Sequence, residues 1–100
     1  MTMDKRPAVY IMASGRNGTL YVGVTSDLVA RVHAHRSGES GGFAARYRCV
    51  ALVYYELYDE MTPAILREKQ LKAGSRAKKL ARIKALNPTW RDLFDDIACP

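Results

Sequence analysis

Two strand-like runs around a glycine-rich turn constrain this fold more than any other feature of the sequence. Residues 8–13 form a continuous apolar run, and residues 19–25 alternate between apolar and polar side chains. The Asn-Gly pair at positions 17–18 between them is typical of a tight β-hairpin turn. A two-residue turn keeps the loop even in length, so Tyr10 and Tyr21 should point to the same face of the sheet.

The rest of the chain predicts one more strand and several helices. Asp27 can cap a helix over residues 28–36, and the Gly- and Ser-rich residues 37–42 predict a loop. Residues 49–57, rich in Val and Tyr, predict the third strand. Further helices are predicted after the N-cap pair Thr62-Pro63 to about residue 73, over residues 76–86, and from a Thr89-to-Asp92 capping box through residue 97.

These elements follow the order β-β-α-β-α-α-α. They predict an α/β chain of the α+β type, in which helices flank a small three-stranded antiparallel or mixed sheet. At 100 residues we expect a single domain over residues 1–100 with a core from about 8 to 97. No apolar run approaches the roughly 20 residues of a membrane helix, and the N-terminal region does not resemble a signal peptide. We therefore expect no membrane partner and a cytoplasmic location, with Cys49 and Cys99 as free thiols.

The charge of the chain favours a nucleic-acid partner. Sixteen Lys and Arg residues against ten Asp and Glu residues give a formal net charge of +6. The excess gathers between residues 64 and 91, where Glu68 is the one acidic residue. The basic residues there are Arg67, Lys69, Lys72, Arg76, Lys78, Lys79, Arg82, Lys84 and Arg91. A solvated helical face is the simpler interpretation of such a run taken alone.

Several residues could carry chemistry, although each also has an ordinary structural interpretation. Tyr10 and Tyr21 could be packing residues of the hairpin. Arg31 and His35 are four positions apart and share one helix face, where Arg31 could simply pair with Asp27. Glu68 could form a helix pair with Lys72, or its carboxylate could hold a divalent ion together with a phosphate.

Taken together, these residues resemble a known family. Val9-Tyr10 followed by Tyr21-Val22-Gly23 is similar to the two-part signature of the GIY-YIG nucleases. Arg31, His35 and Glu68 fall at the family's spacing, and Asn87 is similar to its late asparagine. The resemblance covers residues 8–97 and is strongest to small bacterial members that look like the N-terminal nuclease domain of the excision-repair subunit UvrC. Apolar substitutions next to the tyrosines and the Ala73-Gly74 helix end depart from the family pattern.

The resemblance implies a catalytic site with one divalent ion, Mg²⁺ or Mn²⁺, held by Glu68 and the scissile phosphate. It implies that Arg31 holds phosphate oxygens and that Tyr10 or Tyr21 orients or deprotonates water, with His35 as a relay. We favour Tyr10 as the base, which requires Arg31 or the metal to lower its pKa. Asn87 is either an orienting residue or a helix C-cap. The expected nucleic-acid contacts are Arg67, Lys69, Lys72, Arg76, Lys78 and Lys79.

The sequence therefore predicts a metal-dependent endonuclease that hydrolyses DNA phosphodiester bonds in repair or recombination. RNA stays open as a substrate, because phosphate contacts do not read the sugar. We expect no additional DNA-binding domain, so that specificity comes from this domain, a homodimer or a repair-protein partner. One alternative is a nucleic-acid-binding module without catalysis. Another is a protein-interaction surface around Tyr54, Tyr55 and Tyr58.

Overall fold

Strand β1 (Ala8–Ala13) is the centre of the sheet, and all six of its residues are buried. It pairs in antiparallel fashion with β2 (Leu20–Thr25) on one side and with β3 (Ala51–Leu57) on the other. The strand order is β2-β1-β3, so β2 and β3 are edge strands. The structure is a computed structural model, which describes residues 5–39 and 41–98.

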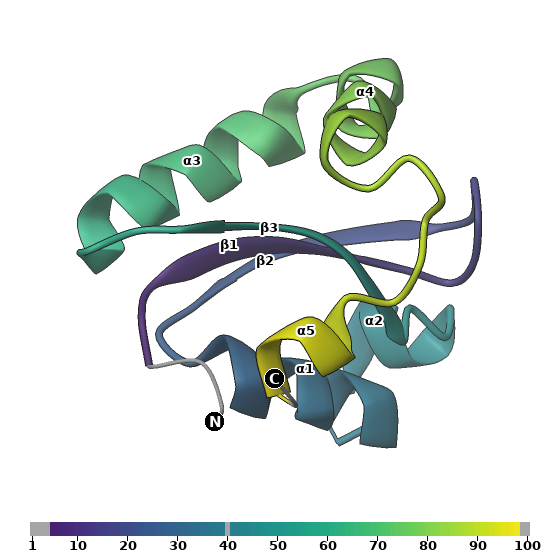
Figure 1. Ribbon diagram of the computed structural model, residues 1–100, viewed down its shortest axis with the longest axis horizontal. Coiled ribbons are helices and arrows are strands. Elements are labelled where there is room, and N and C mark those ends of the chain that lie inside the picture. The colour runs from purple at the N-terminus through teal and green to yellow at the C-terminus, as the bar shows by residue number, and fades with distance from the viewer. Residues whose placement is uncertain (1–4, 40, 99–100) are drawn as a thin grey trace.

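Helices cover both faces of the sheet (Figure 1). The helices are α1 (Leu28–Ser37), α2 (Gly42–Arg46), α3 (Met61–Ala73), α4 (Arg76–Leu86) and α5 (Phe94–Ala98). Helices α3 and α4 lie on one face, and α1, α2 and α5 lie on the other. Because side chains alternate along β1, Val9 and Ile11 pack toward α3 and α4, whereas Tyr10 and Met12 pack toward α1 and α5. The prediction of an antiparallel sheet flanked by helices is confirmed.

The hairpin loop is longer than the predicted two-residue turn. The Ser14 amide donates to the Thr19 carbonyl and the Gly18 amide donates to the Gly15 carbonyl, each at 3.0 Å. The four residues between Ser14 and Thr19 thus form the turn, with Asn17 at a φ of 57°. Its length is still even, so Tyr10 and Tyr21 share a face as predicted.

The structure contains a short helix, α2, in a segment for which no helix was predicted. Helix α2 begins at Gly42 with Gly41 as its N-cap residue, and the φ angles of the two glycines, 64° and 62°, lie in the left-handed region that favours glycine. A helix of five residues is too short to show a hydrophobic period. Its neighbours shift accordingly: α1 extends to Ser37, and β3 begins at Ala51 because the Cys49 amide bonds back to Ala44.

Two of the predicted capping signals in the C-terminal half are wrong in detail. Helix α3 begins at Met61 with Glu60 as its N-cap residue, so that Pro63 lies within the first turn. Helix α5 begins at Phe94 rather than after Thr89. Asp92 acts instead as a tether, since its Oδ1 accepts hydrogen bonds from the Phe94 amide at 3.0 Å and the Leu52 amide at 3.2 Å. Tertiary contact with β3 therefore overrides the local capping pattern.

No helix within residues 5–39 and 41–98 is long and apolar enough to cross a membrane. Cys49 is a buried free thiol, as predicted, while Cys99 lies outside the described residues.

Candidate active site

Three rings meet on the α1 face of the hairpin. Tyr10 and Tyr21 come from adjacent strands, and His35 reaches them from α1. Ring centroids lie 6.4 Å apart for Tyr10 and Tyr21, 5.6 Å for Tyr10 and His35, and 5.1 Å for Tyr21 and His35. The Tyr10 hydroxyl lies 2.8 Å from His35 Nε2, in a buried hydrogen bond. The sequence-predicted tyrosines and histidine are thus in direct contact.

The glycine of the Tyr-Val-Gly motif creates the space for this arrangement. In the β1–β2 register, Gly23 lies opposite Tyr10. A Cβ atom at position 23 would lie 2.4 Å from the Tyr10 hydroxyl oxygen, well inside van der Waals contact. The Tyr10 ring can therefore lie against β2 only because residue 23 has no side chain.

The local environment keeps Tyr10 and His35 uncharged. Burial raises the pKa of Tyr10 well above its usual range, and nearby Tyr21 and Glu68 act in the same direction, while Arg31 opposes them. Burial, helped by the Arg31 charge, lowers the pKa of His35. At neutral pH the pair is therefore a protonated phenol bonded to a neutral imidazole.

Arg31 lies one helical turn before His35 and is exposed. The predicted alternative, an Asp27–Arg31 ion pair, does not form. The Asp27 side chain caps α1 by accepting from the Ala30 amide at 3.2 Å and lies 3.9 Å from Lys5. Within residues 5–39 and 41–98, Arg31 forms no ion pair with a carboxylate. Its guanidinium, which also hydrogen-bonds the Tyr10 side chain, therefore lies beside the ring cluster without a carboxylate partner in that part of the chain.

Glu68 approaches the same place from the opposite face of the sheet. Helix α3 packs across β2 and β1, and the Glu68 charge is among those that act on Tyr10. Its carboxylate forms an ion pair with Lys72 at 2.9 Å. The Glu68 side chain is 14% exposed and that of Lys72 is 53% exposed, so the carboxylate is largely shielded from solvent while the lysine is not. The candidate site therefore straddles the edge strand β2.

The donor set at Glu68 fits a divalent ion that is completed by substrate. No group of three or more His, Cys, Asp or Glu side chains in the described part of the chain could hold a metal alone. Mg²⁺ is commonly bound through one or two carboxylates together with waters and substrate phosphates. Glu68 could serve as that single carboxylate once it exchanged Lys72 for the ion.

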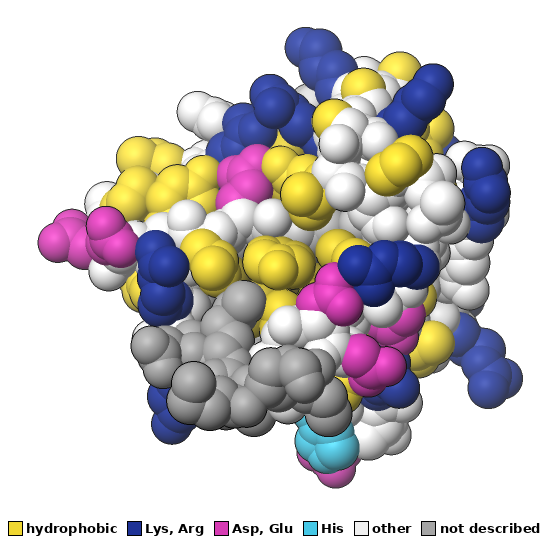
Figure 2. All heavy atoms as spheres, viewed as in Figure 1, with side chains coloured by type: hydrophobic (Ala, Val, Ile, Leu, Met, Phe, Trp, Pro, Cys, Tyr) yellow, Lys and Arg dark blue, Asp and Glu magenta, His cyan; other side chains and the backbone are white. Residues whose placement is uncertain are grey.

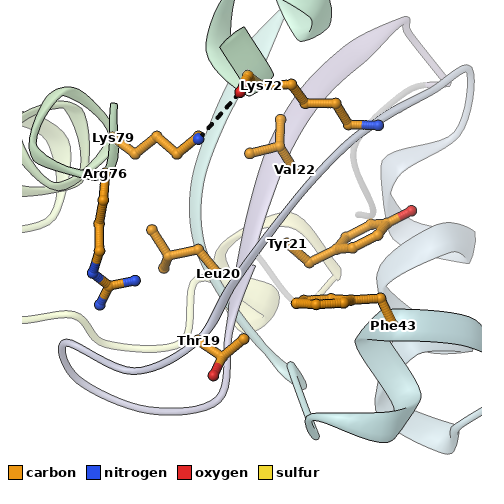
Figure 3. A pocket seen from close by; sticks show the side chains of 8 residues that line it. All are labelled: Thr19, Leu20, Tyr21, Val22, Phe43, Lys72, Arg76 and Lys79. Atoms are coloured by element: carbon orange, nitrogen blue, oxygen red, sulfur yellow. Dashed lines mark hydrogen bonds between the residues drawn. The ribbon is translucent and has the colours of Figure 1, made fainter. Parts of the chain in front are cut away.

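A groove of about 460 Å³ runs beside the ring cluster along β2 (Figure 3). The cationic side chains of Lys72, Arg76 and Lys79 lie on the α3–α4 side of the strand. Tyr21 and Phe43 lie on the other side. Three of the six basic residues nominated from sequence thus line a groove that adjoins Tyr21.

The remaining nominated basic residues lie elsewhere. Arg67 donates two hydrogen bonds to Glu56 (Nε to Oε1 at 3.0 Å and Nη2 to Oε2 at 3.2 Å). Glu56 also accepts hydrogen bonds from the hydroxyls of Tyr54 and Tyr58. Lys69 and Lys78 are exposed and do not line the groove.

Asn87 lies away from the ring cluster and joins α4 to β3. Its side-chain amide donates to the Val53 carbonyl at 3.2 Å and to the Arg91 carbonyl at 2.8 Å, and its carbonyl oxygen accepts from the Arg91 amide. It is buried and is the C-cap residue of α4. These contacts fit the structural interpretation of Asn87, with no contact to the tyrosines or His35 among them.

Sequence reasoning missed Phe43. The residue lies on α2, in a segment without helical periodicity, and a single aromatic side chain there gave no signal of its role. Only the packing of α2 beside β2 brings Phe43 to the groove.

Comparison with known proteins bears directly on this arrangement. A sequence model of the GIY-YIG catalytic domain matches residues 6–81 of the chain. The chain belongs to the GIY-YIG family. This is a family of nucleases, which act on nucleic acid and generally use a divalent metal. The matched segment includes both tyrosines, Arg31, His35 and Glu68.

This GIY-YIG chain also resembles proteins called UPF0213. UPF0213 proteins of Staphylococcus aureus strains Mu3 and N315 are each 40% identical to it over 76 residues, which is 76% of this chain and 92% of theirs. The solution NMR structure of a UPF0213 protein from Bacillus halodurans aligns with a TM-score of 0.53 at 22% identity, covering 90% of this chain and 95% of the other. That structural likeness supports the fold.

Proposed function

We propose that this GIY-YIG protein is a divalent-metal-dependent endonuclease that hydrolyses DNA phosphodiester bonds, in repair or recombination. The observation that carries the proposal is the convergence of five side chains at the edge of β2. Tyr10, Tyr21, Arg31 and His35 approach from one face of the sheet, and Glu68 approaches from the other. Phosphodiester hydrolysis needs a phosphate clamp, a positioned water and a metal ligand, and this set supplies all three.

Arg31 is the proposed phosphate clamp. Its planar guanidinium can hold two phosphate oxygens at once, which a lysine cannot reproduce. Glu68 is the proposed ligand of one ion, Mg²⁺ or Mn²⁺. The bound ion would neutralise charge on the phosphate and assist the departing 3′ oxygen.

Tyr21 is the better candidate for orienting the attacking water. Tyr21 is half-buried and lines the groove, whereas Tyr10 is fully buried and its raised pKa holds its proton. This reverses the preference for Tyr10 formed from the sequence. Tyr10 is assigned a supporting role: it keeps its proton and its hydroxyl is hydrogen-bonded to His35 Nε2, beside Tyr21 and Arg31.

The test is cleavage of a panel of labelled DNA and RNA substrates, with and without Mg²⁺. Wild type is compared with Glu68→Ala and Arg31→Ala, and Glu39→Ala serves as an exposed acidic control outside the site. We expect metal-dependent cutting of DNA that falls at least 100-fold in both site variants and persists in the control. Folding of each variant is checked by circular dichroism.

A nucleic-acid-binding module without catalysis is the competing function. The ion pair between Lys72 and Glu68 favours it, since a metal would have to displace the lysine before it could bind the carboxylate. If all four proteins bind DNA in a salt-sensitive way and none cuts it under any metal condition, the nuclease proposal is wrong and the binding module is the function.

A further inference from the structure

Helix α2 and its C-cap residue present two large aromatic side chains to solvent. Phe43 is 50% exposed and Tyr47 is 44% exposed. Their ring centroids lie 4.7 Å apart at an interplanar angle of 41°, and the Arg46 guanidinium lies 5.6 Å from the Tyr47 ring centroid. Adjacent exposed aromatics in a small domain are typical of binding surfaces rather than of packing.

The groove pairs this aromatic surface with positive charge. Across β2 from Phe43 stand Lys72, Arg76 and Lys79 (Figure 3). Two of these cations are held by backbone contacts. Arg76 Nη2 donates to the Asn17 and Gly18 carbonyls, both at 2.8 Å, and Lys79 Nζ donates to the Gly74 carbonyl at 3.0 Å. Arg76 is thus held against the hairpin turn, and Lys79 against the connection between α3 and α4.

We propose that Phe43, backed by Tyr47, stacks on an unpaired nucleobase of the strand whose phosphates lie along Lys72 and Lys79. A chain of phosphates that carries flat bases complements both walls of the groove, since cations attract the backbone and aromatic faces stack on bases. An acidic peptide would match the cations alone. A base paired within a duplex has no free face for Phe43, so the stacked nucleotide is single-stranded or extruded.

The stacked base lies next to the reacting phosphate. Phe43 and Tyr21 line the same groove, and Tyr21 contacts His35 at a ring distance of 5.1 Å. The glycines at 41 and 42, both with positive φ, set the backbone turn that brings Phe43 there. This inference rests on the proposed function, for which it specifies how a nucleotide is held beside the cut site.

The test measures binding without cleavage, by fluorescence anisotropy of labelled single-stranded DNA in EDTA. Wild type is compared with Phe43→Ala and Phe43→Trp, and Leu66→Ala is the control, because Leu66 is a 57% exposed apolar side chain of α3 that does not line the groove. We expect Phe43→Ala to weaken binding by about 5- to 150-fold. Phe43→Trp should restore it, and Leu66→Ala should stay within about twofold of wild type.

A second arm locates the contact by placing an abasic site at each oligonucleotide position in turn. At one position, loss of the base should weaken binding by wild type but not by Phe43→Ala, because the stacking partner is already absent. Equal losses in both proteins would overturn the proposal. So would Phe43→Ala binding as tightly as wild type, or a polyglutamate peptide that binds with the same dependence on Phe43.

Cleavage by wild type, run in parallel with Mg²⁺, separates the two proposals. If wild type cleaves DNA and Phe43→Ala binds as tightly as wild type, the stacking proposal is wrong and the nuclease proposal stands. If the abasic-site experiment links Phe43 to one base but wild type cleaves no substrate, the stacking proposal stands and the nuclease proposal is wrong.

Discussion

The hydrogen bond between Tyr10 and His35 joins two side chains that are almost completely buried. Burial disfavours the charged form of each, so it raises the pKa of Tyr10 and lowers that of His35. The spacing of the sequence identified both residues as candidate site residues, but it could not predict that they are buried. Arg31 does act to lower the pKa of Tyr10, as a tyrosine base would require, yet burial outweighs it.

The lowered pKa of His35 predicts that stability falls in mildly acidic solution. Below about pH 6.5 an unfolded histidine binds a proton, while His35 in the folded protein stays neutral. The unfolded state then binds more protons, so the free energy of unfolding should decrease as pH falls from about 7.5 toward 5.5. The slope should be at most about 1.4 kcal/mol per pH unit for this one group. Urea unfolding at a series of pH values measures it.

Two variants test the assignment to His35. His35→Gln should flatten the slope in this window, whereas His33→Gln, which alters an exposed histidine on another face of α1, should leave it. Carboxylates with lowered pKa, such as Glu56 and Asp96, act only at lower pH, so they do not confuse the measurement. An unchanged slope in His35→Gln would mean that another group titrates here.

At the scale of elements, Glu56 couples α3 to β3. Its carboxylate accepts from Arg67 of α3 and from Tyr54 and Tyr58 beside it, and the Arg67 and tyrosine hydrogen bonds lower the pKa of Glu56 despite burial. In turn, burial and the Glu56 charge raise the pKa of Tyr54 to about 12. From the sequence, Arg67 was predicted to contact phosphate, and the tyrosines were considered as a separate protein-interaction surface. Their mutual contact could not be seen from charge alone, because α3 and β3 meet only in the folded chain.

This network predicts that two neighbouring cations of α3, Arg67 and Lys69, differ in their contribution to stability. Arg67→Ala should lower the free energy of unfolding by about 1–3 kcal/mol, because it leaves the half-buried Glu56 without its cation. DNA affinity should stay within about twofold of wild type. Lys69→Ala, at an exposed position on the same helix, should change stability by less than about 0.5 kcal/mol. Urea unfolding and anisotropy check both expectations, and a stable but binding-deficient Arg67→Ala would return Arg67 to the nucleic-acid interface.

At the scale of the whole molecule, α4 is the most basic helix, with five Lys and Arg residues. Figure 2 shows Lys and Arg side chains gathered over α4 and the adjoining end of α3, which is the end that borders the groove. The formal net charge of the chain is +6. Such a surface attracts polyanions over distances comparable with the Debye length, so binding should depend strongly on salt.

The salt dependence predicts which cations contact phosphate. Affinity for single-stranded DNA should fall as salt rises, and Lys72→Gln and Lys79→Gln should each reduce the slope of log K against log salt by about 0.7. Lys84→Gln should leave the slope unchanged, because Lys84 does not line the groove. Titrations between roughly 50 and 200 mM salt measure these slopes. Equal slopes in all three variants would place the DNA on another surface.

The sequence by itself determined the hairpin, the shared face of Tyr10 and Tyr21, the capped start of α1 and the family of the chain. These depend on contacts between neighbours in the chain, on side-chain alternation and on residue spacing, all of which a sequence records. Only the tertiary structure decided that Arg67 binds Glu56 and that Asn87 joins α4 to β3. It also decided that Tyr10 is fully buried and that Phe43 lines the groove. Each of these depends on burial or on contact between elements distant in sequence, and those distances are set when helices pack on both faces of the sheet.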